Sequence, residues 1–245
     1  MTSTRATISF SPPFGYDLCA RRVRAEDVAR YDLSAWRIAG IGAEPIRAEL
    51  PDRFARLLAP AGFDPRAFVP CYGMAESSLA ISFSRLRQGV VVDWIDADHL
   101  AENMRVNPAA AGASRVSGFV RCGAPLPGHE IAIRDDQGHA VPDLHGGRGK
   151  VREPRVRAGY FGKPEQTRQA LSPDGWLDTG DIGYLVDGSV VVTGRHKDMI
   201  IINGRNIWPQ DIEQIAERQP ELRAMGASAF FVLGADDEEI AVVVV

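Results

Sequence analysis

The chain has 245 residues, a formal net charge of −4, 45% apolar and 24% charged residues. These values exclude wholesale disorder, and the acidic balance gives no electrostatic reason to expect a nucleic-acid partner. The three cysteines are widely spaced and lack a CxxC pair, which argues against a disulfide framework or zinc ribbon and favours a reducing compartment. No apolar run reaches transmembrane length and residues 1–6 lack the apolar core of a signal peptide, so we expect a soluble, cytoplasmic protein.

Helix and strand alternate in the first 63 residues. The run 36–42 is predicted to be a short buried strand that ends at the glycine–proline turn 42–45. A helix is predicted over 47–59, where Leu50, Phe54, Leu57 and Leu58 lie at helical spacing. A second short strand, 68–73, also ends in a glycine turn. Loops at the ends of neighbouring strands are the usual place for a ligand crevice.

The rest of the chain is predicted to be richer in strands. Between about 84 and 117 the periodicity is poor, and a tight loop follows at 123–128. Strands are predicted at 130–134 and 199–202, and a strand–turn–strand at 176–193 with Asp187-Gly188 as its turn. Pro209 fits the first position of a helix on which Ile212, Ile215 and Ala216 face one way. The sequence ends within the β-branched run 240–245, so we interpret the chain as cut inside a strand.

The first candidate site is the run Tyr72-Gly73-Met74-Ala75-Glu76 at a strand end. It offers an aromatic face, a flexible glycine and a carboxylate, which together suit a purine and a divalent metal on a phosphate. An ordinary loop with a surface glutamate fits the same five residues.

The second candidate site is the run 175–181, which places Asp181 directly after a glycine. A carboxylate there can accept both hydroxyl groups of a ribose, as acidic residues do in nucleotide sites. A turn or capping aspartate is the alternative.

The third candidate segment, 194–213, combines a charged joint, a strand, a glycine turn and a helix begun by proline. An exposed charged joint between two packed units suits a hinge, in which a few backbone torsions change. A solvated loop is the alternative.

In order and spacing these runs resemble the adenylate-forming superfamily, and most closely its fatty acyl-AMP ligases. The resemblance extends from Thr7-Ile8-Ser9-Phe10 and Phe14-Gly15-Tyr16-Asp17-Leu18 to the terminal strand, and its most specific part is 195–213. It implies a mixed α/β fold with a partial AMP-binding large domain over 1–196 and the start of a small carboxy-terminal subdomain over 197–245. The loose stretch at about 84–120 resembles the insertion that separates fatty acyl-AMP ligases from CoA ligases.

The resemblance also implies roles for single residues. Gly42-Ala43-Glu44-Pro45 would line the adenine site and acyl tunnel, and the run Cys71 to Ala75 would bind the nucleotide, with Tyr72 stacked on adenine. Ala75 stands where many relatives have threonine. Glu76 would hold the Mg²⁺ that bridges the phosphates of ATP, Asp181 would bind the ribose with help from Arg195, and Lys197 would be the hinge.

Two features depart from the family pattern. No phosphate loop precedes Phe14 and no carboxy-terminal catalytic lysine is present, so we expect the 245 residues alone not to complete the reaction. Five basic residues lie between Arg148 and Arg157 with the single acid Glu153, where relatives have an apolar strand. Basic side chains at inward-facing positions would be costly to bury unpaired, which indicates sequence drift or an altered reading frame; an exposed edge is the alternative.

Three hypotheses for function remain open from the sequence. The first is part of a fatty acyl-AMP ligase, which would activate a fatty acid with ATP and Mg²⁺ and deliver it to an acyl carrier protein or polyketide synthase. The second is a non-catalytic remnant that binds AMP or docks onto a complementary fragment. The third is part of a fatty acyl-CoA synthetase.

Overall fold

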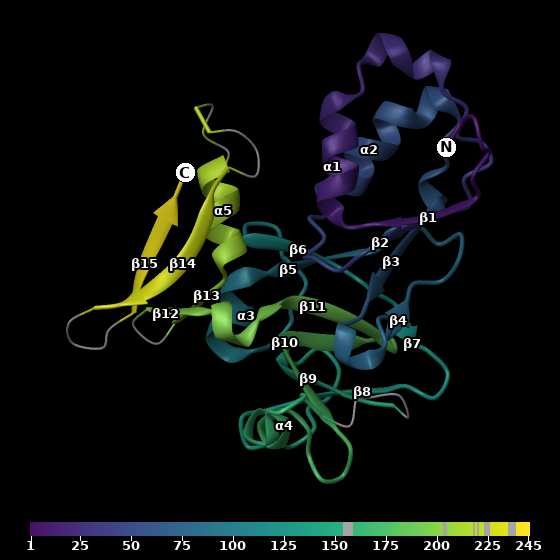
Figure 1. Ribbon diagram of the computed structural model, residues 1–245. Helices are drawn as coiled ribbons and strands as arrows, with labels where there is room; N and C mark the ends of the chain where they lie inside the picture. The colour runs from purple at the N-terminus through teal and green to yellow at the C-terminus, as the bar shows by residue number, and fades with distance from the viewer. Residues whose placement is uncertain (154–158, 203–204, 218, 220, 223–225, 235–238) are drawn as a thin grey trace.

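The computed structural model describes residues 1–153, 159–202, 205–217, 219, 221–222, 226–234 and 239–245. Its architecture is mixed α/β, as predicted, with two larger sheets and three two-stranded sheets (Figure 1). Three features of the sequence analysis lie outside the described residues: Arg155, Arg157 and the glycine turn Asn203-Gly204 of the third candidate segment. No helix in the described part of the chain is long and apolar enough to cross a membrane.

The first sheet carries the two strand ends that the sequence singled out. Its strand order is β1-β2-β3-β4-β7, with β1, β2 and β3 parallel and the other pairs antiparallel. Because β2 and β3 run in the same direction, the loops that follow them leave the same edge of the sheet. The strands span Ile8–Ser11 (β1), Ile38–Ile41 (β2), Phe68–Tyr72 (β3), Ser82–Phe83 (β4) and Ala124–Pro125 (β7).

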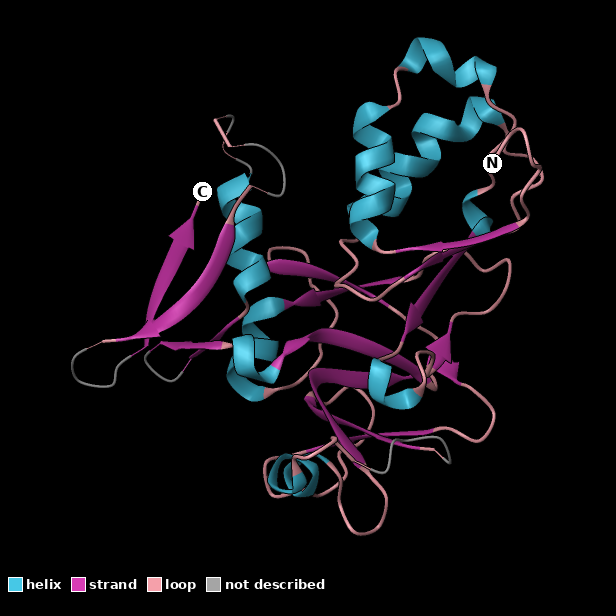
Figure 2. Ribbon diagram, viewed as in Figure 1, coloured by secondary structure: helices cyan, strands magenta, loops and turns pink. Residues whose placement is uncertain are grey.

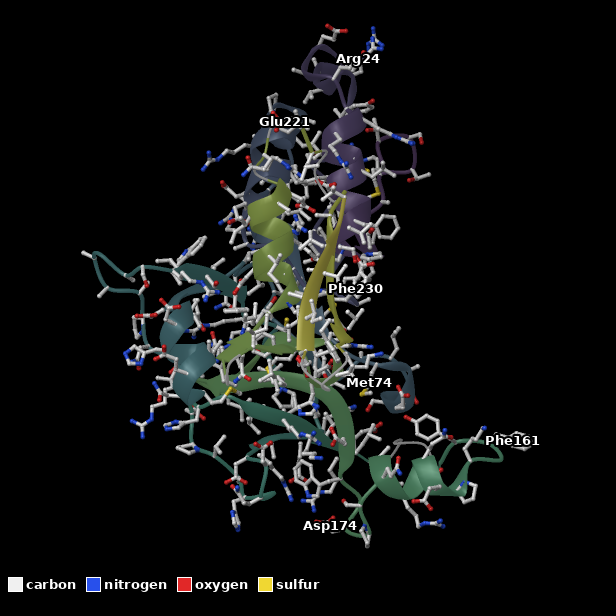
Figure 3. The ribbon with its side chains drawn as sticks, turned by 90° about the vertical axis from the view of Figure 1, so that its left-hand side faces the viewer. Arg24, Met74, Phe161, Asp174, Glu221 and Phe230 are labelled. Atoms are coloured by element: carbon white, nitrogen blue, oxygen red, sulfur yellow. The ribbon has the colours of Figure 1, made fainter. Side chains whose placement is uncertain are left out.

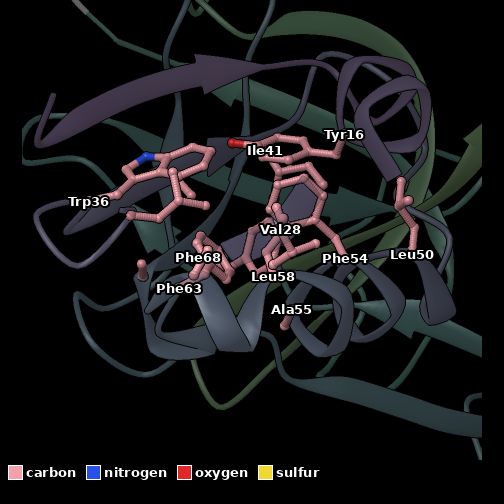
Figure 4. Close-up of a cluster of buried hydrophobic side chains, with 14 residues drawn as sticks. Tyr16, Val28, Trp36, Ile41, Leu50, Phe54, Ala55, Leu58, Phe63 and Phe68 are labelled. Atoms are coloured by element: carbon pink, nitrogen blue, oxygen red, sulfur yellow. The ribbon is translucent and has the colours of Figure 1, made fainter. Parts of the chain in front are cut away.

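Two helices, α1 (Pro13–Arg22) and α2 (Glu49–Leu58), pack together beside β1–β3, in the upper right of Figure 2. Their core is an aromatic cluster in which Phe54 makes edge-to-face contacts with Tyr16, Trp36 and Phe63 (Figure 4). Leu50, Phe54 and Leu58 of the predicted stripe are buried and Leu57 is half-buried, so the helical spacing correctly identified this core. The Tyr16 hydroxyl donates to the Gly40 carbonyl at 2.9 Å, which ties α1 to β2.

The second sheet is antiparallel, in the order β11-β10-β9-β8. The predicted turn Asp187-Gly188 joins β10 to β11 with φ of 49° and 72°. Positive φ at both turn residues suits the right-handed twist of the flanking strands and favours aspartate followed by glycine. The strands span Glu130–Arg134 (β8), Gly147–Arg152 (β9), Leu177–Val186 (β10) and Ser189–Arg195 (β11).

The two sheets are joined at the tight loop that the sequence predicted near residue 123. The Cys122 amide donates to the Val190 carbonyl at 2.8 Å, and the Val190 amide donates to the Gly123 carbonyl at 2.9 Å. Gly123 has φ of 80°, and a Cβ there would lie 1.9 Å from the Phe83 carbonyl oxygen. This close approach requires glycine.

The basic run on β9 does not lie at an exposed edge, which was the alternative in the sequence analysis. β9 pairs with strands on both sides, so it is an interior strand, and Val151 faces the core. Arg148, Lys150 and Arg152 alternate with it onto the opposite face, where Lys150 pairs with Asp178 at 2.6 Å. Arg148, Lys150 and Arg152 therefore each have an acidic partner on a half-buried face, although Nε of Arg148 is buried without a hydrogen-bond partner among the described residues.

The stretch 84–117, for which no element was predicted, contains most of a two-stranded sheet and a helix. Asp96 caps the helix: its side chain accepts hydrogen bonds from the backbone amides of residues 98 and 99 at 3.0 and 3.2 Å. The elements are β5 (Val92–Asp96), α3 (Ala97–Asn103) and β6 (Val116–Val120).

The carboxy-terminal elements follow a short 3-10 helix at His196–Asp198. The helix begins at Pro209, as predicted, but Ile215 is 59% exposed, so the predicted apolar face is only partly covered. The terminal β-branched run pairs with a strand that the sequence analysis did not predict. The elements are β12 (Ile200–Ile202), β13 (Arg205–Ile207), α5 (Pro209–Glu217), β14 (Ser228–Leu233) and β15 (Glu239–Val244).

Ion pairs attach α5 to the rest of the molecule. Arg47 forms a two-pronged pair with Glu217, whose side chain is 6% exposed. Arg115 pairs with Asp211 at 2.8 Å. The remaining helices are α4 (Pro164–Ala170) and the 3-10 turns Ala25–Arg30, Ala59–Ala61, Pro65–Ala67 and Ala75–Ser77.

Replacing Phe54, which is 2% exposed, with alanine is expected to lower the free energy of unfolding by about 3–5 kcal/mol, because it empties the centre of the aromatic cluster. Urea unfolding measures the loss. Phe14→Ala is the matched control: its side chain is 49% exposed, and its cost is expected to stay within about 0.5 kcal/mol. Equal costs for the two variants would contradict the placement of the core.

Candidate functional site

Two tight loops follow the neighbouring strands β2 and β3. A Cβ at Gly42 would lie 2.4 Å from the Cys71 carbonyl oxygen, and a Cβ at Gly73 would lie 1.7 Å from the Leu79 carbonyl oxygen. Both glycines are therefore required by close backbone approach. Ala43 and Leu79 have φ of 69° and 102°, a costly region for residues with side chains. Backbone strain of this kind is concentrated at functional sites, and neither residue type signals it in the sequence.

Tyr72 and Asp181 connect the two sheets directly. The Tyr72 hydroxyl, at the end of β3, donates to Oδ2 of Asp181 on β10 at 2.6 Å. Nε of Arg195, on the adjacent strand β11, lies 3.4 Å from Oδ1 of the same carboxylate. Three of the residues predicted to bind the nucleotide therefore form one chain of contacts, although 109 positions separate the first two.

Burial controls the ionisation of this pair. The Asp181 side chain is 12% exposed, and its burial raises the pKa of the carboxyl group, against the opposing effects of the Tyr72 hydrogen bond and the Arg195 charge. Burial and the nearby Asp181 charge raise the pKa of the Tyr72 phenol well above its ordinary value. The phenol thus stays a neutral donor, and the carboxylate keeps acceptor capacity.

Glu76 forms a hydrogen bond with Tyr160, which comes from a distant part of the sequence. Glu76 lies in the 3-10 turn after β3, and the Tyr160 hydroxyl donates to its Oε1 at 3.0 Å. Tyr160 was not among the predicted site residues, because the 84 positions between the two residues give no pattern that pairs them.

A hollow of about 750 Å³ opens beside these contacts. Most of its lining residues have polar or charged side chains, and three of them are residues of the site: Arg195 and Lys197, which were predicted, and Tyr160, which was not. Its lining residues are Arg148, Tyr160, Gln166, Gln169, Ala170, Asp178, Thr179, Gly180, Arg195, His196 and Lys197. We refer to it as the β10–α4 hollow.

The predicted residues are not all at this hollow. Asp181 and Tyr72 do not line it; they line a separate and much smaller cavity of about 10 Å³, so their surroundings are closely packed. In the described part of the chain, the hollow is not lined by any residue of the predicted run Gly42-Ala43-Glu44-Pro45. Met74 lies in the β3 loop (Figure 3), and the half-buried Cys71 thiol donates to the Ile41 carbonyl at 3.4 Å.

Glu76 could hold Mg²⁺ only if a bound nucleotide supplied further oxygen atoms to the ion. Among the described residues, no group of three or more histidine, cysteine, aspartate or glutamate side chains is placed to hold a metal ion. Mg²⁺ usually binds through one or two carboxylates together with substrate phosphates and water. A single carboxylate at the end of β3 fits that mode.

Comparison with known proteins identifies the family. The family model described as AMP-binding enzyme matches residues 1–161. The chain belongs to the AMP-binding enzyme family. The chain is 44% identical over 241 residues to a putative acyl-CoA synthetase of Caulobacter vibrioides, covering 98% of the chain and 42% of that protein.

Two further relatives agree with this assignment. The chain is 38% identical to the medium-chain-fatty-acid–[acyl-carrier-protein] ligase JamA of Moorena producens, covering 98% of the chain and 42% of JamA. A solved structure from work on fatty acyl-adenylate ligases of E. coli and L. pneumophila superimposes with a TM-score of 0.90 at 48% identity, covering 98% of the chain and 43% of that structure. The chain thus spans less than half the length of these relatives.

Asp178 at the hollow provides a pH test of the site's charges. Burial opposes ionisation, but the hydrogen bonds from Lys150 and the Gly180 amide, with the charges of Lys150 and Arg148, hold the pKa of Asp178 below its usual range. The pKa of an aspartate in the unfolded chain is about 3.9, so above that pH the ionised Asp178 stabilises the folded state. This stabilisation is lost as the pH falls through the lower pKa that Asp178 has in the folded protein. Asp178→Asn is therefore expected to cost about 1–2 kcal/mol at pH 7 and progressively less at acid pH.

Urea unfolding at several pH values measures this difference. Asp52→Asn is the control, since Asp52 pairs with Arg56 at a side-chain exposure of 59% and should change stability by less than about 0.5 kcal/mol. A cost for Asp178→Asn that persists unchanged at pH 3 would show that charge is not its cause.

Proposed function

We propose that this chain supplies the adenosine-binding part of a ligase that activates a fatty acid with ATP as an acyl-adenylate. The observation that carries the proposal is the contact of Tyr72 with Asp181 beside Arg195, at the point where β3 and β10 meet. An aromatic ring, an acceptor and a cation are the groups that an adenine, a ribose and a phosphate require.

The Asp181 carboxylate has acceptor capacity left for a ribose. An ionised carboxylate offers roughly four lone-pair sites, and Tyr72 and Arg195 contact one oxygen each. The remaining acceptor sites can take the two ribose hydroxyl groups without breaking the contact with Tyr72. The neutral Tyr72 phenol holds the carboxylate in place, while its ring lies where we propose that adenine stacks, with the Gly42–Pro45 loop and the run Cys71 to Ala75 beside it.

Glu76 is proposed to hold Mg²⁺, which when bound supplies positive charge to the phosphates of ATP. Arg195 is proposed to contact the phosphate side of the nucleotide, since it is 60% exposed at the side chain and lines the hollow. Lys197 lies in the 3-10 turn between β11 and β12. We propose that this turn is the hinge between a large domain, 1–196, and a small one, 197–245.

The acyl group is proposed to go to the thiol of an acyl carrier protein, free or within a polyketide synthase. The support is the name of JamA, an acyl-carrier-protein ligase, at 38% identity; the 44% identical Caulobacter protein is named for CoA instead, so CoA is the alternative acceptor. The three cysteines are all free, which agrees with a reducing compartment, and we place the reaction in the cytoplasm.

Isothermal titration of the purified chain with AMP tests the proposal. We expect measurable binding by the wild-type chain, and about 10- to 100-fold weaker binding by Asp181→Asn, because the loss of hydrogen bonds to a charged acceptor costs about 1.5–3 kcal/mol. Asp187→Asn is the control, since Asp187 is 81% exposed at a turn that tolerates asparagine.

Absence of AMP binding by the wild-type chain would contradict the proposal. Equal affinities for the wild type and Asp181→Asn would contradict the role of Asp181 while leaving nucleotide binding intact.

A further inference from the structure

Tyr160 and Glu76 form a contact for which the nucleotide-binding account above has no use. The Tyr160 hydroxyl donates to Oε1 of Glu76 at 3.0 Å, and Tyr160 also lines the β10–α4 hollow. We propose that Tyr160 is a positioning residue: it fixes the Glu76 carboxylate so that its remaining oxygen sites face a divalent cation bound with the nucleotide. This inference rests on the proposed function, because it requires Glu76 to be the metal-binding carboxylate.

Tyr160 is itself held by α4. Its backbone amide donates to the Thr167 hydroxyl oxygen at 2.9 Å, and that hydroxyl donates to the Lys163 carbonyl at 2.9 Å. The backbone before Tyr160 approaches the same threonine closely, since a Cβ at Gly159 would lie 2.7 Å from Thr167 Cγ2. The start of α4 thus provides a fixed support for the phenol. Phe161, the next residue, points away from the body (Figure 3) and takes no part in the contact.

A glutamate in a surface loop is otherwise a poorly fixed ligand. Glutamate is among the side chains that lose most rotamer freedom when they are immobilised, and Glu76 lies beside Ser78 and Leu79, whose φ values of 52° and 102° show a tightly bent loop. A partner that fixes the carboxylate before the metal arrives removes part of this entropic cost from binding. Metal-binding carboxylates are commonly oriented by such outer hydrogen bonds.

The chemistry of the partner also suits this role. A phenol donates one hydrogen bond without bringing a positive charge, so Glu76 keeps its negative charge for the cation. Oε2 and the second lone pair of Oε1 stay available. A lysine or arginine at position 160 would fix the carboxylate equally well but would oppose a cation next to it.

The test measures metal affinity without any acyl transfer. Electron paramagnetic resonance of free Mn²⁺, titrated into the purified chain at saturating ATP and without fatty acid, gives the Mn²⁺ dissociation constant. We expect Tyr160→Phe to raise this constant about 10-fold or more and Glu76→Gln to raise it further. The affinity for ATP without metal should be the same in both variants and the wild type.

Tyr184→Phe is the matched control. Its hydroxyl also donates to a carboxylate oxygen at 3.0 Å, Oδ2 of Asp93, but it is buried on β10 among residues that do not line the hollow. This variant loses the same type of bond and should keep the wild-type Mn²⁺ constant. A purely structural role for Tyr160 would instead lower the affinity for metal-free ATP along with the melting temperature.

The outcomes separate the two proposals. If the wild-type chain does not bind ATP, the proposed function fails and this inference fails with it. Two results would show that the positioning role is wrong while the proposed function stands. In the first, ATP binds but Tyr160→Phe keeps the wild-type dissociation constant for Mn²⁺. In the second, Tyr160→Phe weakens the binding of metal-free ATP by the same factor as the binding of Mn²⁺. Selective loss of Mn²⁺ affinity in Tyr160→Phe and Glu76→Gln, but not in Tyr184→Phe, supports it.

Discussion

The hydrogen bond between Tyr72 and Asp181 is the contact on which the site depends. It joins the end of a strand in the mixed first sheet to a strand of the antiparallel second sheet, at 2.6 Å. Two glycines allow the geometry of this contact. Gly73 allows the sharp turn after β3, and Gly123 allows the close approach at which the two sheets are joined. Arg195 lines the β10–α4 hollow, and Glu76 is joined to the same hollow through its hydrogen bond with Tyr160. The chemistry proposed for each residue follows from that shared location.

The site combines charged pairs at its rim with neutral donors inside. Lys150 and Arg148 balance the charge of Asp178 at the hollow, where all three side chains are partly buried. Inside, two phenols donate to the two carboxylates, Tyr72 to Asp181 and Tyr160 to Glu76. Neutral donors fix a carboxylate without cancelling its charge, so the acids keep their capacity for hydroxyl groups and cations. The arrangement is what the binding of an anionic nucleotide with a divalent cation requires.

Local sequence patterns predicted the elements that depend on local physics. Helical spacing around Phe54, the Asp187-Gly188 turn and Pro209 at a helix start each specify structure within a few residues. The glycine turn predicted after the strand 68–73 correctly placed Tyr72 at a strand end. The alternation on β9 was misinterpreted, because periodicity does not show which strands lie on either side of it or that Asp178 lies opposite Lys150.

The features that the sequence did not predict depend on distant contacts. Tyr160 and Glu76 are joined by the folding of intervening strands, and no spacing rule predicts such a pair. The strained backbone at Ala43 and Leu79 is imposed by the loops' surroundings and contradicts local preference. At Ile215 the local pattern predicted too much: the helical spacing placed this side chain on an apolar face, yet little of the described chain covers it.

The central claim is that β3 and β10 together form one adenosine site, and photolabelling with 8-azido-AMP tests it most directly. The account predicts that peptide mass spectrometry will find the label on the segment that follows Cys71 and on the segment from Leu177 to Arg195, and that excess AMP will abolish both signals. Labelling confined to α1, α2 or the β14–β15 sheet, or labelling that AMP does not compete away, would contradict it.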